Sequence, residues 1–367
     1  MNRILAHFPL PGSGITALIW MLALSQSETA EVYSPVFGFL KYDCPANSDT
    51  VVSVPFHSSP RWAGRLSDAP SNQGGNVMRL SLKDSPSFAT GELTDTPHLF
   101  LCRDQAGPAG RYFDIVAHGA NTVDISALPA DLGALTTDGL ISIVPAWTLD
   151  RLFPADTQTT FHASGGPLAS DRVSELLFFD DLTPGTSLAP TRRFYVTDAA
   201  WFEVGSFGEA GSTVVLPGQA FIVRHPSGVA MTEFVANQQV FGEVVSLPVR
   251  VANGKARDTM LALPRPVTVT LDQLDLGPGV FEESSSTDPG DRKDQLLVFD
   301  NASVLQNKGP SATYFRSGGQ WLRDGTNAQS GSQSIEPSAG LLIRKAAGGS
   351  DQVLQWANAP TYDVTAP

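Results

Sequence analysis

Short apolar stretches separated by turn residues recur along most of this chain, and they predict strands rather than helices. Residues 267–271 alternate apolar and polar side chains with a period of two, the pattern of a half-buried strand. Continuous apolar runs at 176–179 and 296–299 suit strands that are buried on both faces. No helical pattern reaches four turns, and 145–154 is the best candidate for a short helix. The pattern therefore predicts an all-β protein and leaves sandwich and barrel both open.

Part of this pattern occurs twice. Residues 176–180 read Leu-Leu-Phe-Phe-Asp and residues 296–300 read Leu-Leu-Val-Phe-Asp, at an offset of 120 positions. The same offset links three single residues and one longer run: Trp201 with Trp321, Pro217 with Pro337, Arg224 with Arg344, and 220–224 with 340–344. Several landmarks at one constant offset predict a duplicated structural unit.

A second match lies at another offset and indicates an insertion. Val-Val-Ser-Val-Pro at 51–55 resembles Val-Val-Ser-Leu-Pro at 244–248, an offset of 193. The two offsets differ by 73 residues, which we place as an insertion within about 84–170 of the first copy. We therefore expect two sandwich-like or barrel-like β units, the first over 31–237 with the insertion and the second over 238–367.

The composition fits this fold, and the net charge disfavours some classes of binding partner. Gly (33), Pro (27) and a charged fraction of only 17% favour many short strands joined by turns. Hydrophobic residues make up 42% of the 367 residues, enough for packed cores. The net charge of −13, with no basic cluster, disfavours nucleic acid and anionic membranes as partners.

The N-terminus has the features of a secretory signal peptide. Arg3 supplies a positive charge, 15–24 is apolar and uncharged, and the small residues Ser25 and Ser27 fit a cleavage site. The apolar run is shorter than the roughly 20 residues that span a bilayer, and no later stretch of the sequence is long and apolar enough. We expect residues 1–30 to be removed, and the mature chain, without a transmembrane segment, to reach the periplasm, the cell surface or the medium. The alternative for 1–30 is a buried strand or helix.

The sequence does not determine whether the two cysteines, Cys44 and Cys102, are free thiols or form a disulfide. Neither belongs to a Cys-x-x-Cys motif or to a Cys/His metal spacing. In an exported protein they can form one disulfide, and two separate thiols in apolar strands fit the sequence equally well.

Three tryptophans are candidates for ligand binding: Trp147, Trp201 and Trp321. An exposed tryptophan can stack an apolar ring face on a sugar, which would make a glycan a possible partner. An aromatic residue beside a strand is more often part of the core, so both roles stay open.

Two sets of acidic residues stand out. Asp180 and Asp300 follow equivalent apolar runs, where the simplest role is to accept backbone N–H bonds in the next turn, and paired ligand sites are the alternative. Asp288, Asp291 and Asp294 recur every three residues in a Ser-, Gly- and Pro-rich stretch. Such oxygen-rich loops can hold calcium outside the cell, but the spacing is not that of an EF-hand, so a solvated loop is the alternative.

The remaining polar landmarks identify no catalytic residue and no organic cofactor. Arg224 and Arg344 end apolar runs, and we expect each to pair with an acid across the sheet or to lie over an aromatic ring. The histidines beyond the leader form neither an HExxH nor an HxH pattern. A Gly-x-Ser-x-Gly elbow is also missing beyond the leader.

Several phrases resemble a known group of sequences. They lie at 51–56, 110–115, 121–123, 138–149 and 152–154, and the most specific is Ile-Val-Pro-Ala-Trp-Thr-Leu at 143–149. With these phrases the chain resembles an uncharacterised family of exported proteins found mainly in verrucomicrobial bacteria. The chain departs from that family at 117–121, where Ala-His-Gly-Ala-Asn replaces a phrase closer to Ala-Asn-Thr-Ala-Asn. The resemblance implies export and a shared fold, and it implies no activity.

These observations favour an exported, non-enzymatic structural or binding protein of the cell envelope. The alternative is a carbohydrate-binding module or a glycoside hydrolase that uses an acidic pair. Buried tryptophans would favour the first, and an exposed tryptophan in a cleft beside two acids would favour the second. Edge strands can also pair between molecules, which would give self-association.

Overall fold

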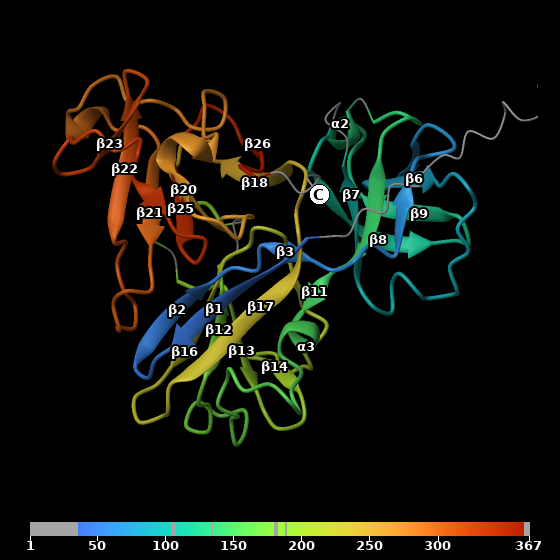
Figure 1. The fold of residues 1–367 in the computed structure, drawn as a ribbon, viewed down its shortest axis with the longest axis horizontal. Coiled ribbons are helices and arrows are strands. Elements are labelled where there is room, and N and C mark those ends of the chain that lie inside the picture. Colours follow the sequence, from blue (N-terminus) through green and yellow to red (C-terminus); the bar gives the residue numbers. More distant parts are fainter. Residues whose placement is uncertain (1–35, 104–107, 134, 180–182, 188, 363–367) are drawn as a thin grey trace, which may run out of the picture. The chain divides into compact units, whose positions relative to one another are not determined.

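The structure is a computed structural model that describes residues 36–103, 108–133, 135–179, 183–187 and 189–362. Most regular elements are strands, which confirms the all-β prediction (Figure 1). The helices of the described residues are single turns: α2 (Pro129–Leu132), α3 (Leu149–Leu152), and the 3-10 helices η1 (Leu271–Leu274) and η2 (Pro289–Asp291). In this part of the chain no helix has the length and apolar character that crossing a membrane requires. The expected signal peptide, 1–30, lies outside the described residues.

One five-stranded antiparallel sheet is the centre of the first β unit. Its strands lie in the order β14 (Trp201–Glu203), β13 (Arg192–Val196), β12 (Glu175–Phe178), β16 (Phe221–His225) and β2 (Ser48–Val52). Two smaller sheets belong to the same unit: β1 (Phe37–Cys44), β17 (Thr232–Val240) and β3 (Phe56–His57) form one, and β11 (Trp147–Thr148) and β15 (Val214–Val215) the other. On β16 the side chains of Phe221 and Val223 are buried in the core of this unit, whereas Ile222 and Arg224, which alternate with them, are half-buried. This alternation gives the sheet an inner face and an outer face.

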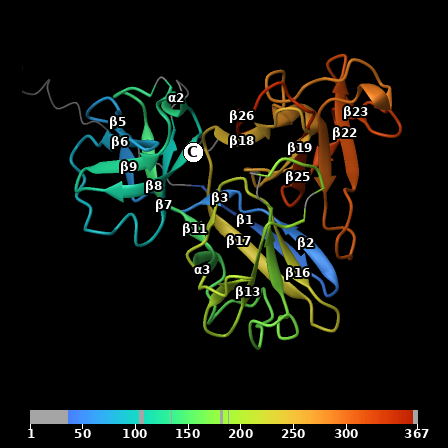
Figure 2. The same cartoon turned by 180° about the vertical axis from the view of Figure 1, so that it is seen from behind.

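A second five-stranded sheet repeats the strand order of the first. It runs β23 (Gln320–Arg323), β22 (Ala312–Ser317), β21 (Gln295–Phe299), β25 (Gly340–Lys345) and β19 (Arg257–Ala262). Its smaller pairs are β18 (Val245–Val251) with β26 (Gln352–Asn358), and β20 (Val269–Thr270) with β24 (Ser334–Ile335). Figure 2 shows both sets of strands from behind. A duplication would produce this common order, and the duplication itself stays a prediction.

The second sequence match joins strands that occupy different places. Val51 lies on β2, which pairs with β16, and the equivalent neighbour of β25 is β19. Residues 245–251 form β18, which pairs with β26 as β1 pairs with β17. The alignment of 51–55 with 244–248 is therefore wrong, and the offset of 193 does not measure the insertion. Both segments read as buried strands, and that pattern does not specify which neighbour a strand has.

A seven-stranded sheet accounts for the extra residues of the first unit. Its order is β4 (Trp62–Gly64), β10 (Ile141–Pro145), β7 (His98–Cys102), β8 (Tyr112–His118), β9 (Thr122–Ser126), β6 (Val77–Ser81) and β5 (Ser71–Gly74). Backbone bonds from Ser67 to Ser81 and from Lys83 to Arg65 join the segment after β4 to the end of β6, so the sheet folds back on itself. The sheet begins and ends earlier than the insertion predicted at 84–170.

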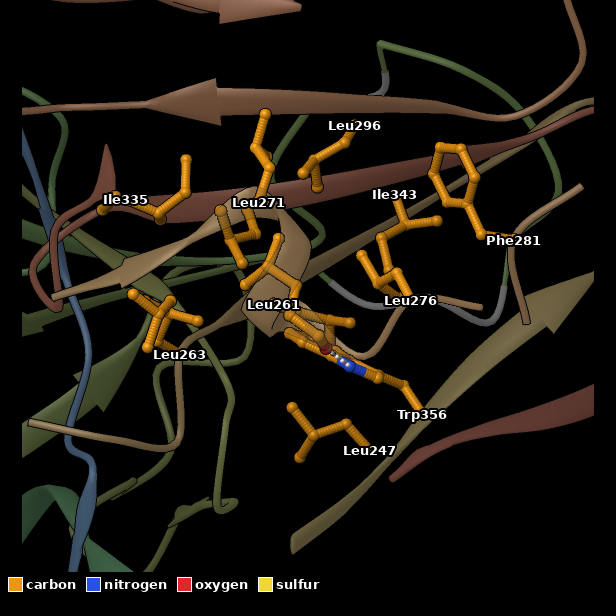
Figure 3. Close-up of a cluster of buried hydrophobic side chains, with 14 of the residues drawn as sticks. Leu247, Leu261, Leu263, Leu271, Leu276, Phe281, Leu296, Ile335, Ile343 and Trp356 are labelled. Carbon is orange, nitrogen blue, oxygen red and sulfur yellow. Dashed lines mark hydrogen bonds between the residues drawn. The ribbon is translucent and has the colours of Figure 1, made fainter. Parts of the chain in front are cut away.

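Each of the three groups of strands encloses its own hydrophobic cluster. The cluster of the second unit is drawn in Figure 3, where Trp356 donates from Nε1 to the carbonyl oxygen of Leu274 at 2.5 Å. Within the helix predicted at 145–154, only α3 is helical, because the residues directly before it form β11. The strand predicted at 267–271 is only β20, because the chain turns into η1 at Leu271.

Candidate functional site

Two matching ion pairs lie on the outer faces of the five-stranded sheets. Arg224 donates from Nε and Nη2 to the two carboxylate oxygens of Asp49, at 2.7 and 2.6 Å. Arg344 binds Asp258 in the same two-pronged way, at 2.8 and 2.9 Å. The pKa of each guanidinium is raised above its ordinary value, first because of its hydrogen bonds to the acid. The prediction that each arginine pairs with an acid across the sheet is confirmed.

A loop of the second unit closes over the first pair. In the β21–β22 loop, the carbonyl oxygen of Leu305 accepts from the backbone N–H of Asp49 at 3.1 Å. The backbone N–H of Asn307 donates to Oδ2 of Asp49 at 2.7 Å, and its Oδ1 accepts from Arg224 Nη2 at 2.7 Å. We call Asp49, Arg224 and Asn307 the first clasp.

A loop of the first unit closes over the second pair in the same manner. In the β12–β13 loop, the carbonyl oxygen of Gly185 accepts from the N–H of Asp258 at 2.9 Å. The N–H of Ser187 donates to Asp258 Oδ2 at 2.7 Å, and its Oγ accepts from Arg344 Nη2 at 3.1 Å. We call Asp258, Arg344 and Ser187 the second clasp.

The two clasps are equivalent down to the backbone. Ser187 and Asn307 are 120 positions apart, the offset of the repeat, and both adopt left-handed backbone with φ of 54° and 53°. A side chain in this region costs on the order of 1 kcal/mol, so the surrounding contacts must hold it there. Each unit thus extends one loop to bind the Asp–Arg pair of the other unit.

Between the clasps, the outer faces of the two sheets pack together. Val51, Ala220 and Ala262 are buried in one small cluster, with Ile222 and Met260 packed against it. A groove of about 510 Å³ opens beside this cluster. Its apolar lining includes Ile222, Met260, Leu297, Phe299 and Leu342, and its polar lining includes both ion pairs. The size lies within the range of small-molecule sites.

Lys308 is a further cation in the lining of this groove. Its Nζ donates to the carbonyl oxygen of Ser303 at 3.3 Å. Among the described residues no carboxylate lies within ion-pair distance of it. Burial lowers the pKa of Lys308, because the groove removes part of the water around its ammonium group.

The tryptophans predicted to bind a ligand do not share a cleft: Trp147 lines one small pocket, and Trp321 lines a separate hollow of about 300 Å³ together with Asp272 and Asp275. Trp201 is fully buried and donates from Nε1 to the Phe153 carbonyl oxygen at 2.7 Å, and Trp321 is 3% exposed. The buried ring of Trp201 presents no face on which a sugar could stack, whereas the ligand-binding role of Trp321 stays a prediction. Trp147 is half-buried, bonds the carbonyl oxygen of Phe56 at 2.8 Å and lies under the guanidinium of Arg151. All three belong to a hydrophobic core or pack against one.

The three acids proposed for calcium point to different partners. Asp294 is completely buried and pairs with the ammonium of Lys345. Asp291 accepts from the Ser286 hydroxyl at 2.6 Å, and the backbone carbonyl of Asp288 accepts from Arg292 at 3.2 Å. In the described part of the chain no three His, Cys, Asp or Glu side chains come together as metal ligands. Asp294 thus turns inward to the lysine and away from the other two acids, and calcium binding stays a prediction.

Asp300 has the local role expected of it. Its Oδ1 accepts from the N–H of Ala302 at 3.0 Å, which closes an Asx turn after β21. Its counterpart Asp180 lies outside the described residues.

One cleft of about 480 Å³ does gather carboxylates, at residues of β8 and β14 and of the loop before β15. Glu203 is tied to Arg192 by bonds of 2.8 and 3.0 Å, which lower its pKa. Burial raises the pKa of Asp114, and Glu209 also lines the cleft. None of the tryptophans of the described residues lines this cleft, so the combination that would have favoured carbohydrate chemistry is not found there.

A buried Ser–His pair occupies the first core. Ser174 Oγ and His225 Nδ1 are 2.9 Å apart, and His225 Nε2 lies 2.8 Å from the Thr232 hydroxyl. Both Ser174 and His225 are 0% exposed, so no substrate reaches them in this structure. At the repeat offset of 120 the second unit has Asp294 and Lys345, a buried ion pair in the same place. The pair therefore has a structural use in both units.

The cysteines are separate and buried. Cys44 belongs to the core of the first unit and Cys102 to the core of the seven-stranded sheet, and both are free thiols. Burial raises the pKa of Cys44 to about 11 and that of Cys102 to about 12. Of the two alternatives that the sequence left open, the structure has the separate thiols.

Sequence reasoning missed the acids and loops of the clasps. A usable signal was present, since Asp-Thr at 49–50 and at 258–259 directly precedes Val51 and Met260, which line the groove. Comparison with known proteins adds nothing further, because no protein-family model, no curated protein and no solved structure matches this chain.

Proposed function

We propose that this chain is an exported, non-enzymatic structural protein of the cell envelope, in which two related β units are fastened into one rigid body. The single observation that carries the proposal is the reciprocal exchange of loops at the two clasps. The charged side chains that could otherwise act on a ligand, two arginines and two acids, bind the loops that hold one unit to the other. Export is supported by the signal-peptide pattern at 1–30 and by the resemblance to exported proteins of verrucomicrobial bacteria.

The structural role is tested by calorimetry of the mature chain. We expect the wild-type units to unfold together, and the double variant Asp49→Ala/Asp258→Ala to unfold in two separate transitions. Losing each acid leaves a partly buried guanidinium without its partner, at a cost of about 1–3 kcal/mol. The matched control is Asp124→Ala, which removes an equally two-pronged pair with Arg79 inside the seven-stranded sheet. If the double variant melts like this control, the clasps do not couple the units and the proposal fails.

Export and the carbohydrate alternative have their own tests. Full-length protein expressed in a bacterium should appear in the periplasm with its new N-terminus near residue 31, and a cytoplasmic chain that keeps 1–30 would contradict export. Release of reducing sugar from polysaccharides, lost in Asp114→Asn and Glu209→Gln, would replace the structural proposal with the hydrolase.

A further inference from the structure

The groove between the clasps is built like a site for a small amphipathic molecule. Its floor is the outer face of two sheets, where Ile222, Met260 and Leu342 stay only partly buried although they are apolar. Apolar groups in a concavity of about 510 Å³ are more favourably covered by an apolar body than by water.

The charges of the lining favour an anion. Asp49 and Asp258 compensate the two arginines, and Lys308 adds one positive charge that forms no ion pair with a described carboxylate, although Asp300 and Asp49 are near enough to favour its charged form. The described lining residues therefore sum to a charge of about +1, in a chain whose net charge is −13. A cationic ligand would place its charge beside this ammonium, whereas an anionic one would restore the interactions that the lysine has lost with water.

We propose that this groove binds a small monoanionic amphiphile, a carboxylate on an apolar chain, with the carboxylate at Lys308 and the chain along Ile222, Met260 and Leu342. This binding would be a property additional to the structural role of the clasps. The two can fail separately, because Lys308 makes no bond to either clasp acid.

The probe is dodecanoate, titrated calorimetrically into the mature chain below its micelle concentration. Octanoate and dodecyltrimethylammonium serve as comparisons for chain and charge. We expect dodecanoate to bind more tightly than octanoate, by up to about fourfold per methylene. The cationic amphiphile, with the same chain, should bind at least about tenfold more weakly than dodecanoate.

Two variants locate the site, and one variant controls for charge. Lys308→Gln should weaken dodecanoate about tenfold, and Lys308→Arg should retain most of the affinity. Ala189→Trp places an indole at an exposed position of the groove lining and should abolish binding without disturbing a core. Lys83→Gln removes an exposed lysine in the turn after β6 of the seven-stranded sheet and should change nothing.

Several results would overturn the proposal. They are a failure of dodecanoate to bind, equal affinity for the cationic amphiphile, and binding that survives both Lys308→Gln and Ala189→Trp. The last result would place the amphiphile elsewhere, such as at the exposed Phe37 and Phe39 of β1. The melting profile of each variant shows whether it is folded, and a variant that melts as wild type but loses binding supports the site.

Discussion

Acidification should destabilise this protein through the buried imidazole of His225. The ring is fully buried between Ser174 and Thr232, and the ring of His162 lies 5.3 Å away. Burial, followed by the nearby charge of His162, lowers the pKa of His225 from 6.5 to about 4. Its protonated form is therefore unfavourable in the folded chain.

The sign and size of the effect follow from proton linkage. Above pH 6.5 the ring is neutral in both states and contributes nothing. Between pH 6.5 and 4 the unfolded chain binds a proton that the folded chain excludes, so the free energy of unfolding falls as the pH falls. From pH 7.5 to pH 4.5 the loss is at most about 2.5 kcal/mol.

The assay is urea unfolding followed by tryptophan fluorescence at pH 7.5 and 4.5. The matched variant is His225→Gln, whose amide can bond the same two hydroxyls and does not titrate. Between pH 7.5 and 4.5 the free energy of unfolding should fall by up to about 2.5 kcal/mol more in the wild type than in the variant, since the other titrating groups are common to both. If the stabilities of both proteins fall in parallel, the burial of His225 does not set its protonation and the reasoning is refuted.

Three further predictions concern buried groups. Cys44 and Cys102 should not react with an aromatic disulfide reagent at pH 8 until denaturant is added, because their thiols are buried and protonated, and rapid labelling of the native chain would contradict this. Asp294→Asn should cost about 3–5 kcal/mol in urea unfolding because Lys345 then stays buried without its counter-charge. Adding Lys345→Met should recover much of that loss, and no recovery would mean that the ion pair is not the cause. Trp201→Phe should lower the free energy of unfolding by about 1–3 kcal/mol, since it removes a buried hydrogen bond, while an unchanged midpoint would count against its core role.

The strands were predictable because their signal is local. The runs at 176–179 and 296–299 became β12 and β21 within one residue, as expected of apolar segments buried on both faces. The offset of 120 was equally informative, since it relates the arginines and the loop residues of the two clasps, although only the arginines were singled out from the sequence. The clasp acids, Asp49 and Asp258, do not follow this offset. The match at 193 misled, because any buried β-branched strand resembles any other.

The roles of the candidate ligand-binding residues, by contrast, could not be read from the local sequence. Trp201, Trp321 and Asp294 were ambiguous in sequence, because an aromatic ring or an acid can serve a ligand or a core. Burial places Trp201 and Asp294 inside a core, and burial depends on which elements lie over them. Trp201 is closed off by Phe153 and Phe161, which approach it from α3 and from the loop that follows.

By itself, the sequence determined an all-β chain, its repeated landmarks and the positions of its arginines, because alternation and spacing are properties of neighbouring residues. Only the tertiary structure decided which acid each arginine meets, since Arg224 and Asp49 are 175 positions apart and Arg344 and Asp258 are 86 apart. Strand order brings these partners together, and the loops that close over them come from the opposite unit. A groove between two sheets has no sequence signature of its own, because its lining is collected from strands that are neighbours in space alone.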